Sequence, residues 1–158
     1  MKNKKGFTLV ELLAVIVILA VIILIAVNAV LPQMNRARKN SFADEALNYL
    51  KAAETKYVEE AMNAGSSSGS ETYTVSADLN GQYVSKSSTS GYKGKVILTI
   101  ATTGTNAGNV TNKEVWLTDC NKYMLVAGDA DSKGSNVVTY NSTEWGTAMG
   151  SLSSELCS

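Results

Sequence analysis

The stretch that decides the fold reads GFTLVELLAVIVILAVIILIAV and covers residues 6–27. It follows a basic stub that carries Lys2, Lys4 and Lys5. A helix that is apolar on every face is buried in lipid or among other helices. Twenty helical residues span about 30 Å, which is the thickness of a bilayer's hydrocarbon core. We therefore expect residues 7–34 to form a hydrophobic helix that crosses a membrane, with the lysines on the cytoplasmic side.

Glu11 is a carboxylate inside this apolar register, and ionisable groups in membrane spans mark functional sites. A secretory signal peptide would be cut after the apolar run, but here that run continues into a helical pattern that persists to Met62. A plain membrane anchor accounts for the lysines and the apolar run but not for Glu11. Cleavage between Gly6 and Phe7 would create a free amine one helical turn from Glu11. We expect that Glu11 cannot be satisfied within its own helix and that it meets the amine of a neighbouring chain. Because an unpaired buried charge costs several kcal/mol, this pair would set the register between subunits.

These residues resemble the processing site of the type IV pilin family. The resemblance rests on a basic leader, a glycine, a phenylalanine and a glutamate four residues beyond it, and it covers about the first 30 residues. It implies cleavage after Gly6 by a prepilin peptidase, N-methylation of Phe7 and assembly into a helical filament. It also implies that Glu11 engages the N-terminal amine of a neighbouring subunit. Many members of the family carry a helix-breaking proline where this chain has Asn28, four residues before Pro32.

Pro32 interrupts the helical pattern without ending it. Proline lacks the N–H that would bond the carbonyl of Asn28, and its ring crowds that carbonyl. Because an amphipathic pattern resumes directly afterwards, we expect a kink or a weak link over residues 28–32.

The amphipathic pattern covers residues 35–64 and carries one apolar stripe. Neighbouring members of the stripe are three or four residues apart, as on one face of a helix. They are Phe42, Ala46, Leu50, Ala53, Tyr57 and Ala61. Gly65 is well placed to cap the C-terminus of this helix.

The chain after Gly65 predicts a sheet that packs on the stripe. Runs rich in β-branched and aromatic residues predict strands at residues 73–76, 95–101, 115–118, 123–127 and 137–140. We expect an antiparallel sheet of three or four strands, with one face on the helix. The fold class is therefore α+β, with the apolar half of a long helix protruding from the head.

The expected division of the chain follows from these patterns. A leader, residues 1–6, is removed, and residues 7–34 form the transmembrane and assembly helix. The globular head spans residues 35–158. It consists of the helix half 35–64, a loop at 65–72, and the sheet with a C-terminal disulfide loop at 73–158.

Cys120 and Cys157 are the two cysteines of the chain. An even number in an exported chain favours a disulfide. The bond would tie the tail back to the sheet and is worth about 4 kcal/mol in the chain-entropy model. The alternative is two free buried thiols.

Composition argues against several classes of function. The chain has no histidine, which removes serine–histidine and cysteine–histidine nucleophiles and most zinc sites, so we expect neither an enzyme nor a cofactor. The formal net charge is zero, which argues against a nucleic-acid-binding face. Asp129 and Asp131 alternate like the start of a calcium loop, but the later glutamate is missing, so a solvated turn is favoured over a metal site.

The hydroxyl of Thr8 either accepts from backbone N–H groups of the first turn or is a tolerated small polar group.

We expect a structural subunit, a major type IV pilin that polymerises with copies of itself. The chain would lie in the cytoplasmic membrane, where it meets the prepilin peptidase and a pilus assembly platform, and then in an extracellular filament that serves adhesion, motility, aggregation or DNA uptake. The alternatives are a pseudopilin of a type II secretion or competence system and a minor (tip) pilin.

Overall fold

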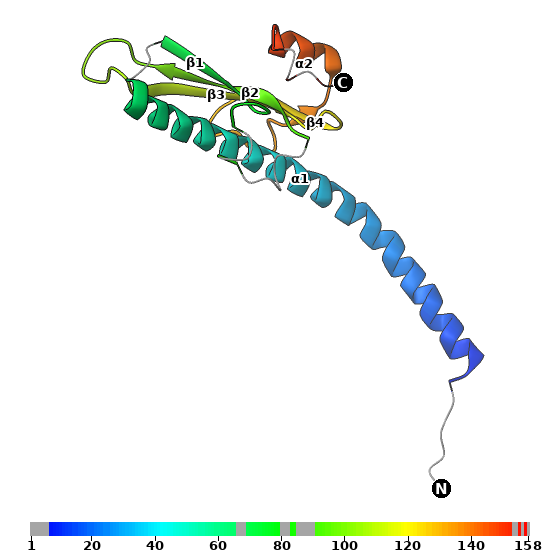
Figure 1. Ribbon diagram of the computed structural model, residues 1–158. Helices are drawn as coiled ribbons and strands as arrows, with labels where there is room; N and C mark the ends of the chain where they lie inside the picture. Colours follow the sequence, from blue (N-terminus) through cyan, green and yellow to red (C-terminus); the bar gives the residue numbers. More distant parts are fainter. Residues whose placement is uncertain are drawn as a thin grey trace. The chain divides into compact units, whose positions relative to one another are not determined.

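The computed structural model describes residues 7–65, 69–79, 83–84, 91–152, 155 and 157. Its elements are α1 (Leu9–Ala64), β1 (Gly69–Thr74), β2 (Lys93–Ile100), β3 (Val110–Thr118), β4 (Tyr123–Gly128), β5 (Val138–Thr139) and α2 (Ser142–Met149) (Figure 1). The chain divides into two compact units, Met1–Ala37 and Arg38–Ser158. A long N-terminal helix packed against an antiparallel sheet confirms the predicted α+β class.

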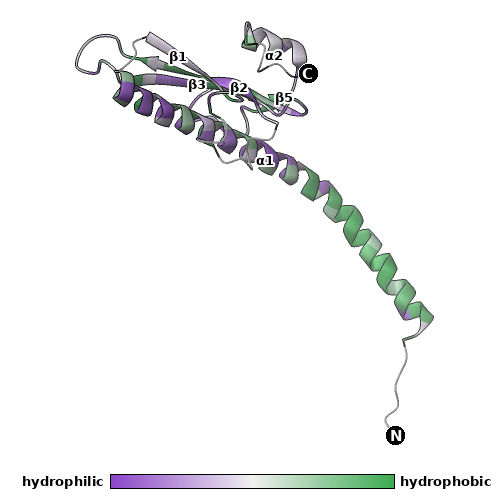
Figure 2. Ribbon diagram, in the orientation of Figure 1, coloured by the Kyte–Doolittle hydropathy of each residue, from purple (hydrophilic) through white to green (hydrophobic). Residues whose placement is uncertain are grey.

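Helix α1 changes character along its length. Figure 2 shows that its first half is coloured mostly as hydrophobic, whereas hydrophilic and hydrophobic residues alternate in its second half. In the second half the buried residues are Phe42, Ala43, Ala46, Tyr49, Leu50, Ala52, Ala53 and Tyr57. This set confirms the predicted stripe as far as Tyr57, and Ala61 is partly buried against the same core. Gly65 ends the helix as predicted, with a φ of 88° and its N–H bonded to the carbonyl of Ala61 at 3.0 Å.

The sheet has five strands in the order β1-β2-β3-β4-β5, and each neighbouring pair is antiparallel. The prediction of three or four strands was therefore too low. Strand β1 includes residues 73 and 74 of the predicted strand 73–76, but it begins at Gly69, inside the stretch 65–72 that we expected to be a loop. Its sequence GSETYT contains poor strand formers, but pairing with β2 from Gly69↔Ile100 to Thr74↔Lys95 overrides that local preference.

The main core lies between the sheet and residues 38–64 of α1. In β2 the alternating residues Val96, Leu98 and Ile100 are buried, as expected for a strand with one face on a core. Phe42 and Tyr49 of α1 contact Tyr92 edge-on, with ring centroids 5.7 and 6.5 Å apart. This packing fixes residues 38–64 to the sheet, so the second unit carries its own core.

A second, smaller core lies on the other face of the sheet, and the sequence analysis missed it. Met124 points away from its neighbours in the main core and packs with Trp145 and Met149 of α2. The side chain of Asn141 caps α2 by accepting hydrogen bonds from the N–H groups of residues 143 and 144, at 3.1 and 3.4 Å. The tail is therefore packed on the sheet as well as tied to it by a disulfide.

Candidate functional site

Thr8 and Glu11 close the first turn of α1 as a capping box. Oε2 of Glu11 accepts hydrogen bonds from the backbone N–H of Thr8 at 2.8 Å and from its hydroxyl at 3.0 Å. In return, the backbone N–H of Glu11 donates to Oγ1 of Thr8 at 3.3 Å. The box satisfies backbone donors that a helix start leaves without partners.

This geometry corrects the expectation that Glu11 cannot be satisfied within its own helix. We had treated Glu11 as an isolated charge, but Thr8 presents an N–H and a hydroxyl to it from one turn away. The structure confirms the view that the Thr8 hydroxyl accepts a backbone hydrogen bond. The hydrogen bonds of Glu11 within the described residues all use Oε2 and the side chain is exposed, so Oε1 remains accessible.

Phe7 precedes the capping box and is 93% exposed. Gly6, the predicted cleavage position, belongs to the leader 1–6 and lies outside the described residues.

The surface of the first unit is apolar and uncovered. Every residue from 7 to 37 is exposed, although most of these side chains are leucine, isoleucine, valine or alanine. A wholly apolar groove of about 220 Å³ is lined by Ile23, Ala26, Val27, Val30 and Leu31. By length and composition the helix can cross a membrane. Exposed apolar surface on this scale marks a contact with lipid or with another protein.

Helix α1 runs through Pro32 without a break. This agrees with the expectation that the proline does not end the helix. The side chain of Asn28 donates from Nδ2 to the carbonyl of Leu24 at 3.4 Å. Asn28 therefore bonds locally along its own helix, and the kink over residues 28–32 stays a prediction.

The C-terminal tail is held by two devices, of which one was predicted. Cys120 and Cys157 form the predicted disulfide, with Cα atoms 5.4 Å apart. The second device is the carboxylate of Glu155, which is fully buried. It accepts hydrogen bonds from the N–H of Gly94 at 2.8 Å and from the N–H and hydroxyl of Ser76. Glu155 therefore closes the end of the β1–β2 ladder from a distant part of the chain.

Asp129 and Asp131, the weak calcium candidates, lie in a loop that the side chain of Asp129 stabilises. Oδ1 of Asp129 accepts from the N–H of Asp131 at 3.0 Å and from the hydroxyl of Ser132 at 3.1 Å. Both aspartates are exposed, and no group of three acidic or other metal-binding side chains is found among the described residues. The geometry is that of a solvated turn, which is the interpretation that the sequence favoured.

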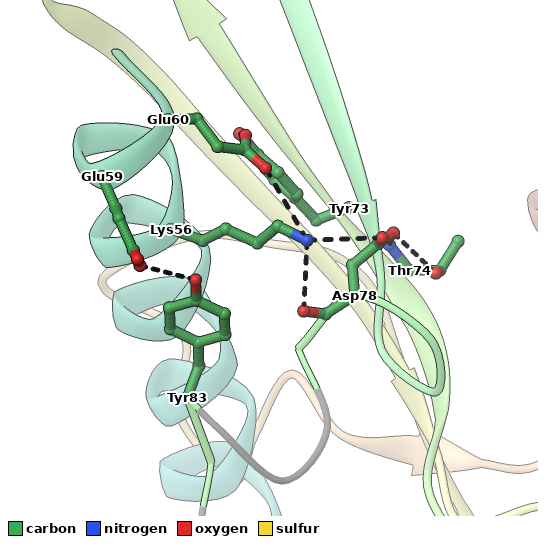
Figure 3. Close-up of polar contacts among 7 residues, drawn as sticks. All are labelled: Lys56, Glu59, Glu60, Tyr73, Thr74, Asp78 and Tyr83. Atoms are coloured by element: carbon green, nitrogen blue, oxygen red, sulfur yellow. Dashed lines mark hydrogen bonds and ion pairs between the residues drawn. The ribbon is translucent and has the colours of Figure 1, made fainter. Parts of the chain in front are cut away.

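A polar cluster on the second half of α1 was not anticipated (Figure 3). Nζ of Lys56 lies 3.4 Å from Oδ1 of Asp78 and over the rings of Tyr73 and Tyr83, at 5.4 and 6.0 Å from their centroids. Each tyrosine hydroxyl donates to a glutamate of α1, at 2.8 and 2.7 Å. The cluster consists of Lys56, Glu59, Glu60, Tyr73, Thr74, Asp78 and Tyr83. These contacts hold the segment that follows β1 against α1. We call the cluster the clamp, because its polar groups bond one another and have a structural role.

Comparison with known proteins adds one finding at the N-terminus. No curated protein and no solved structure matches the chain. A family model described as the prokaryotic N-terminal methylation motif matches residues 1–27, the part that contains the capping box and most of the apolar run. The chain thus carries, over residues 1–27, the prokaryotic N-terminal methylation motif, which is the class III signal peptide of type IV pilins.

Proposed function

We propose that this chain is a prepilin that becomes the structural subunit of an extracellular type IV pilus. Its leader would be removed after Gly6 by a prepilin peptidase, and Phe7 would be methylated as the new N-terminus. The observation that carries the proposal is the uncovered apolar surface of residues 7–37, which starts inside the methylation motif. In the membrane, lipid covers this surface, and in a filament, copies of the same helix cover it.

The apolar surface alone does not explain why the subunits leave the membrane in register. Lipid tails are as apolar as leucine, so transfer from bilayer to filament exchanges one apolar environment for another. Register must therefore come from polar contacts, and Glu11 offers one. The capping box holds its carboxylate at the helix start through Oε2, and Oε1 then accepts from the methylated amine of a neighbouring copy.

The capping box also gives the chain a stable state before assembly. An unsatisfied carboxylate at the edge of a bilayer is costly, and Thr8 lowers that cost in the single subunit. Assembly then adds a partner to Glu11 without first exposing an unpaired charge.

A pseudopilin of a secretion or competence machine shares every N-terminal feature. The disulfide between Cys120 and Cys157 supports a subunit of a long external filament, which must survive outside the cell. Filament length separates the two functions, because a pseudopilin forms only a short fibre.

The test is electron microscopy of material sheared from the surface of the bacterium that encodes the chain, with the subunit identified by mass. We expect long filaments whose subunit begins at N-methylated Phe7. A Gly6→Val variant should remain uncut in the membrane fraction. Absence of filaments, or filaments built from another subunit, would contradict the proposal.

The role of Glu11 has its own test. Glu11→Ala should lower the yield of filaments at least tenfold, while the head keeps its disulfide and the membrane fraction keeps its usual amount of subunit. Glu71→Ala, in an edge strand of the head, is the matched control and should assemble normally. Normal filaments from the Glu11→Ala variant would show that Glu11 is not an assembly contact.

A further inference from the structure

A groove on the head lies between α1 and the loop that follows β4. It has a volume of about 440 Å³ and is lined by Asn40, Ala43, Asp44 and Leu47 of α1 and by residues 130–134 of the loop. We call it the acidic groove, because its lining carries the carboxylates of Asp44 and Asp131 against the single ammonium of Lys133. All of these residues belong to the second unit.

The walls of the acidic groove are held in place by contacts within the head. Gly134 is buried against the backbone of residues 39 and 40, where a Cβ atom would overlap the side chain of Asn40. Nζ of Lys39 donates to the carbonyl of Val137 at 2.8 Å, which fastens the far end of the loop to α1. The groove is therefore formed before any partner arrives, which lowers the entropy cost of binding.

The two carboxylates of the acidic groove are available to a partner. Asp44 and Asp131 are both exposed, and neither forms an ion pair with any of the described residues. Arg38 has the opposite charge and is also exposed, again without an ion pair in the described part of the chain. It cannot reach Asp44 of its own helix, because side chains meet at spacings of three or four residues, and six residues place the two about 120° apart around the axis.

Complementary charges on different faces of one molecule favour a contact between unlike surfaces of two copies. Such a heterologous contact builds an open helical assembly, whereas a contact between like surfaces closes into a pair. This is the type of contact that a filament subunit requires, so the argument rests on the proposed function.

We propose that Arg38 of one copy inserts into the acidic groove of a neighbouring copy and binds Asp44 and Asp131. The planar guanidinium can bond two carboxylates at once, which a lysine ammonium does with less geometric specificity. The contact determines which surfaces of the two copies bind each other, so it contributes specificity more than affinity. It is independent of the N-terminal contact of Glu11, because it joins two heads.

A charge exchange in the full-length chain tests the contact. Arg38→Asp and Asp44→Arg should each lower the ratio of sheared filament to membrane-held subunit at least tenfold. The double variant should recover to within threefold of wild type, because it restores the pair with its charges exchanged. Lys51→Asp reverses an exposed charge on the same helix and should assemble normally. The disulfide of Cys120 and Cys157, read by mass without reductant, shows that each head has folded.

Full assembly of either single variant, or a double variant no better than the single ones, would overturn the contact while leaving the proposed function intact. If a reversed variant fails to fold, Arg38→Gln and Asp44→Asn carry the test. Each removes the charge without reversing it, and Asp44→Asn also keeps the shape of the side chain. Each should lower the yield at least threefold, and wild-type yields from both would overturn the contact. A wild-type chain that makes no filaments would contradict the proposed function. It would also contradict this contact, which is proposed between subunits of a filament.

Discussion

Apolar side chains are exposed in the first half of α1 but buried in the head. Leu19 in the first unit is 51% exposed, whereas Leu98 in the sheet is fully buried. The first unit has no core of its own among its described residues, because every one of them is exposed. The head buries its leucines and valines between two layers. The comparison shows that the head has a core of its own, whereas the described residues of the first unit leave an apolar surface for a cover from outside the chain.

The two units also differ in the sequence distance between a carboxylate and its hydrogen-bond donors. In the first unit Glu11 is satisfied by Thr8, only three residues away. In the head, Glu155 reaches Ser76 and Gly94, which are distant in sequence. The contacts of Glu11 are local and do not depend on what surrounds the first unit, as the proposed transfer from lipid to filament requires, whereas Glu155 depends on the folded structure of the head.

Loss of the disulfide should have the largest effect on the head. Replacing Cys120 and Cys157 by serine removes a cross-link that is worth about 4 kcal/mol in the chain-entropy model. Urea unfolding of the full chain in detergent, followed by tryptophan fluorescence, measures the loss, because Trp116 and Trp145 both lie in the head. Helicity of the apolar half should not change. A free energy of unfolding within about 1 kcal/mol of wild type would show that α2 and Glu155 hold the tail without the bond.

The parts that were predicted correctly are those with a strong local signal. The composition of the apolar run alone identifies it, and the stripe from Phe42 to Tyr57 repeats at helical spacing. The strands β2 to β4 are rich in valine, isoleucine and leucine, so their existence was predicted, with shifts of a few residues at their ends.

The parts that were missed depend on distant contacts, with one exception. Helix α2 has eight residues, too few for a periodic pattern, and it is stable because it packs on Met124. Glutamate is normally a surface residue, so nothing local predicts that Glu155 is buried under the sheet. The exception is the capping box, since Thr8 followed three residues later by Glu11 is a readable signature.

A matched pair of leucine substitutions tests the comparison directly. Leu98→Ala should lower the free energy of unfolding of the head by about 2–5 kcal/mol, because it leaves a cavity in the main core. Leu19→Ala should leave the unfolding midpoint of the head unchanged, because Leu19 is exposed and belongs to neither core. Equal losses from the two variants would contradict the division into a self-contained head and an uncovered helix.

The buried carboxylate of Glu155 should contribute less than a core leucine but more than a surface charge. Glu155→Gln keeps the shape and removes the negative charge that accepts from Gly94 and Ser76, so we expect a loss of about 1–3 kcal/mol. Glu144→Gln, on the exposed first turn of α2, is the control and should cost about 0.5 kcal/mol or less. If both variants lose the same small amount, the charge of Glu155 does not hold the tail, which the disulfide and the packing of α2 then hold.

The smallest expected effect concerns the clamp between α1 and the segment after β1, and it depends on pH. Burial alone would raise the pKa of Asp78, but hydrogen bonds from the N–H and hydroxyl of Thr74, both at 2.7 Å, and the nearby ammonium of Lys56 hold that pKa below its usual value. A lowered pKa in the folded state means that the unfolded state binds protons more readily, so stability falls as the pH falls. The contribution of Asp78 is complete above the unfolded pKa of about 3.9 and disappears as the pH drops through the lower, folded value.

An Asp78→Asn variant isolates this contribution. Because 38% of the Asp78 side chain is exposed, solvent screens the pair, and the variant should be less stable than wild type by at most about 1 kcal/mol at neutral pH. The difference between the two chains should shrink below about pH 4 and vanish once Asp78 is protonated in both states. Urea unfolding at several pH values measures it. A difference that stays constant down to acid would show that the charge of Asp78 is not what fastens this segment. The clamp would then rest on the hydrogen bonds of Tyr73 and Tyr83 to α1, which do not depend on that carboxylate.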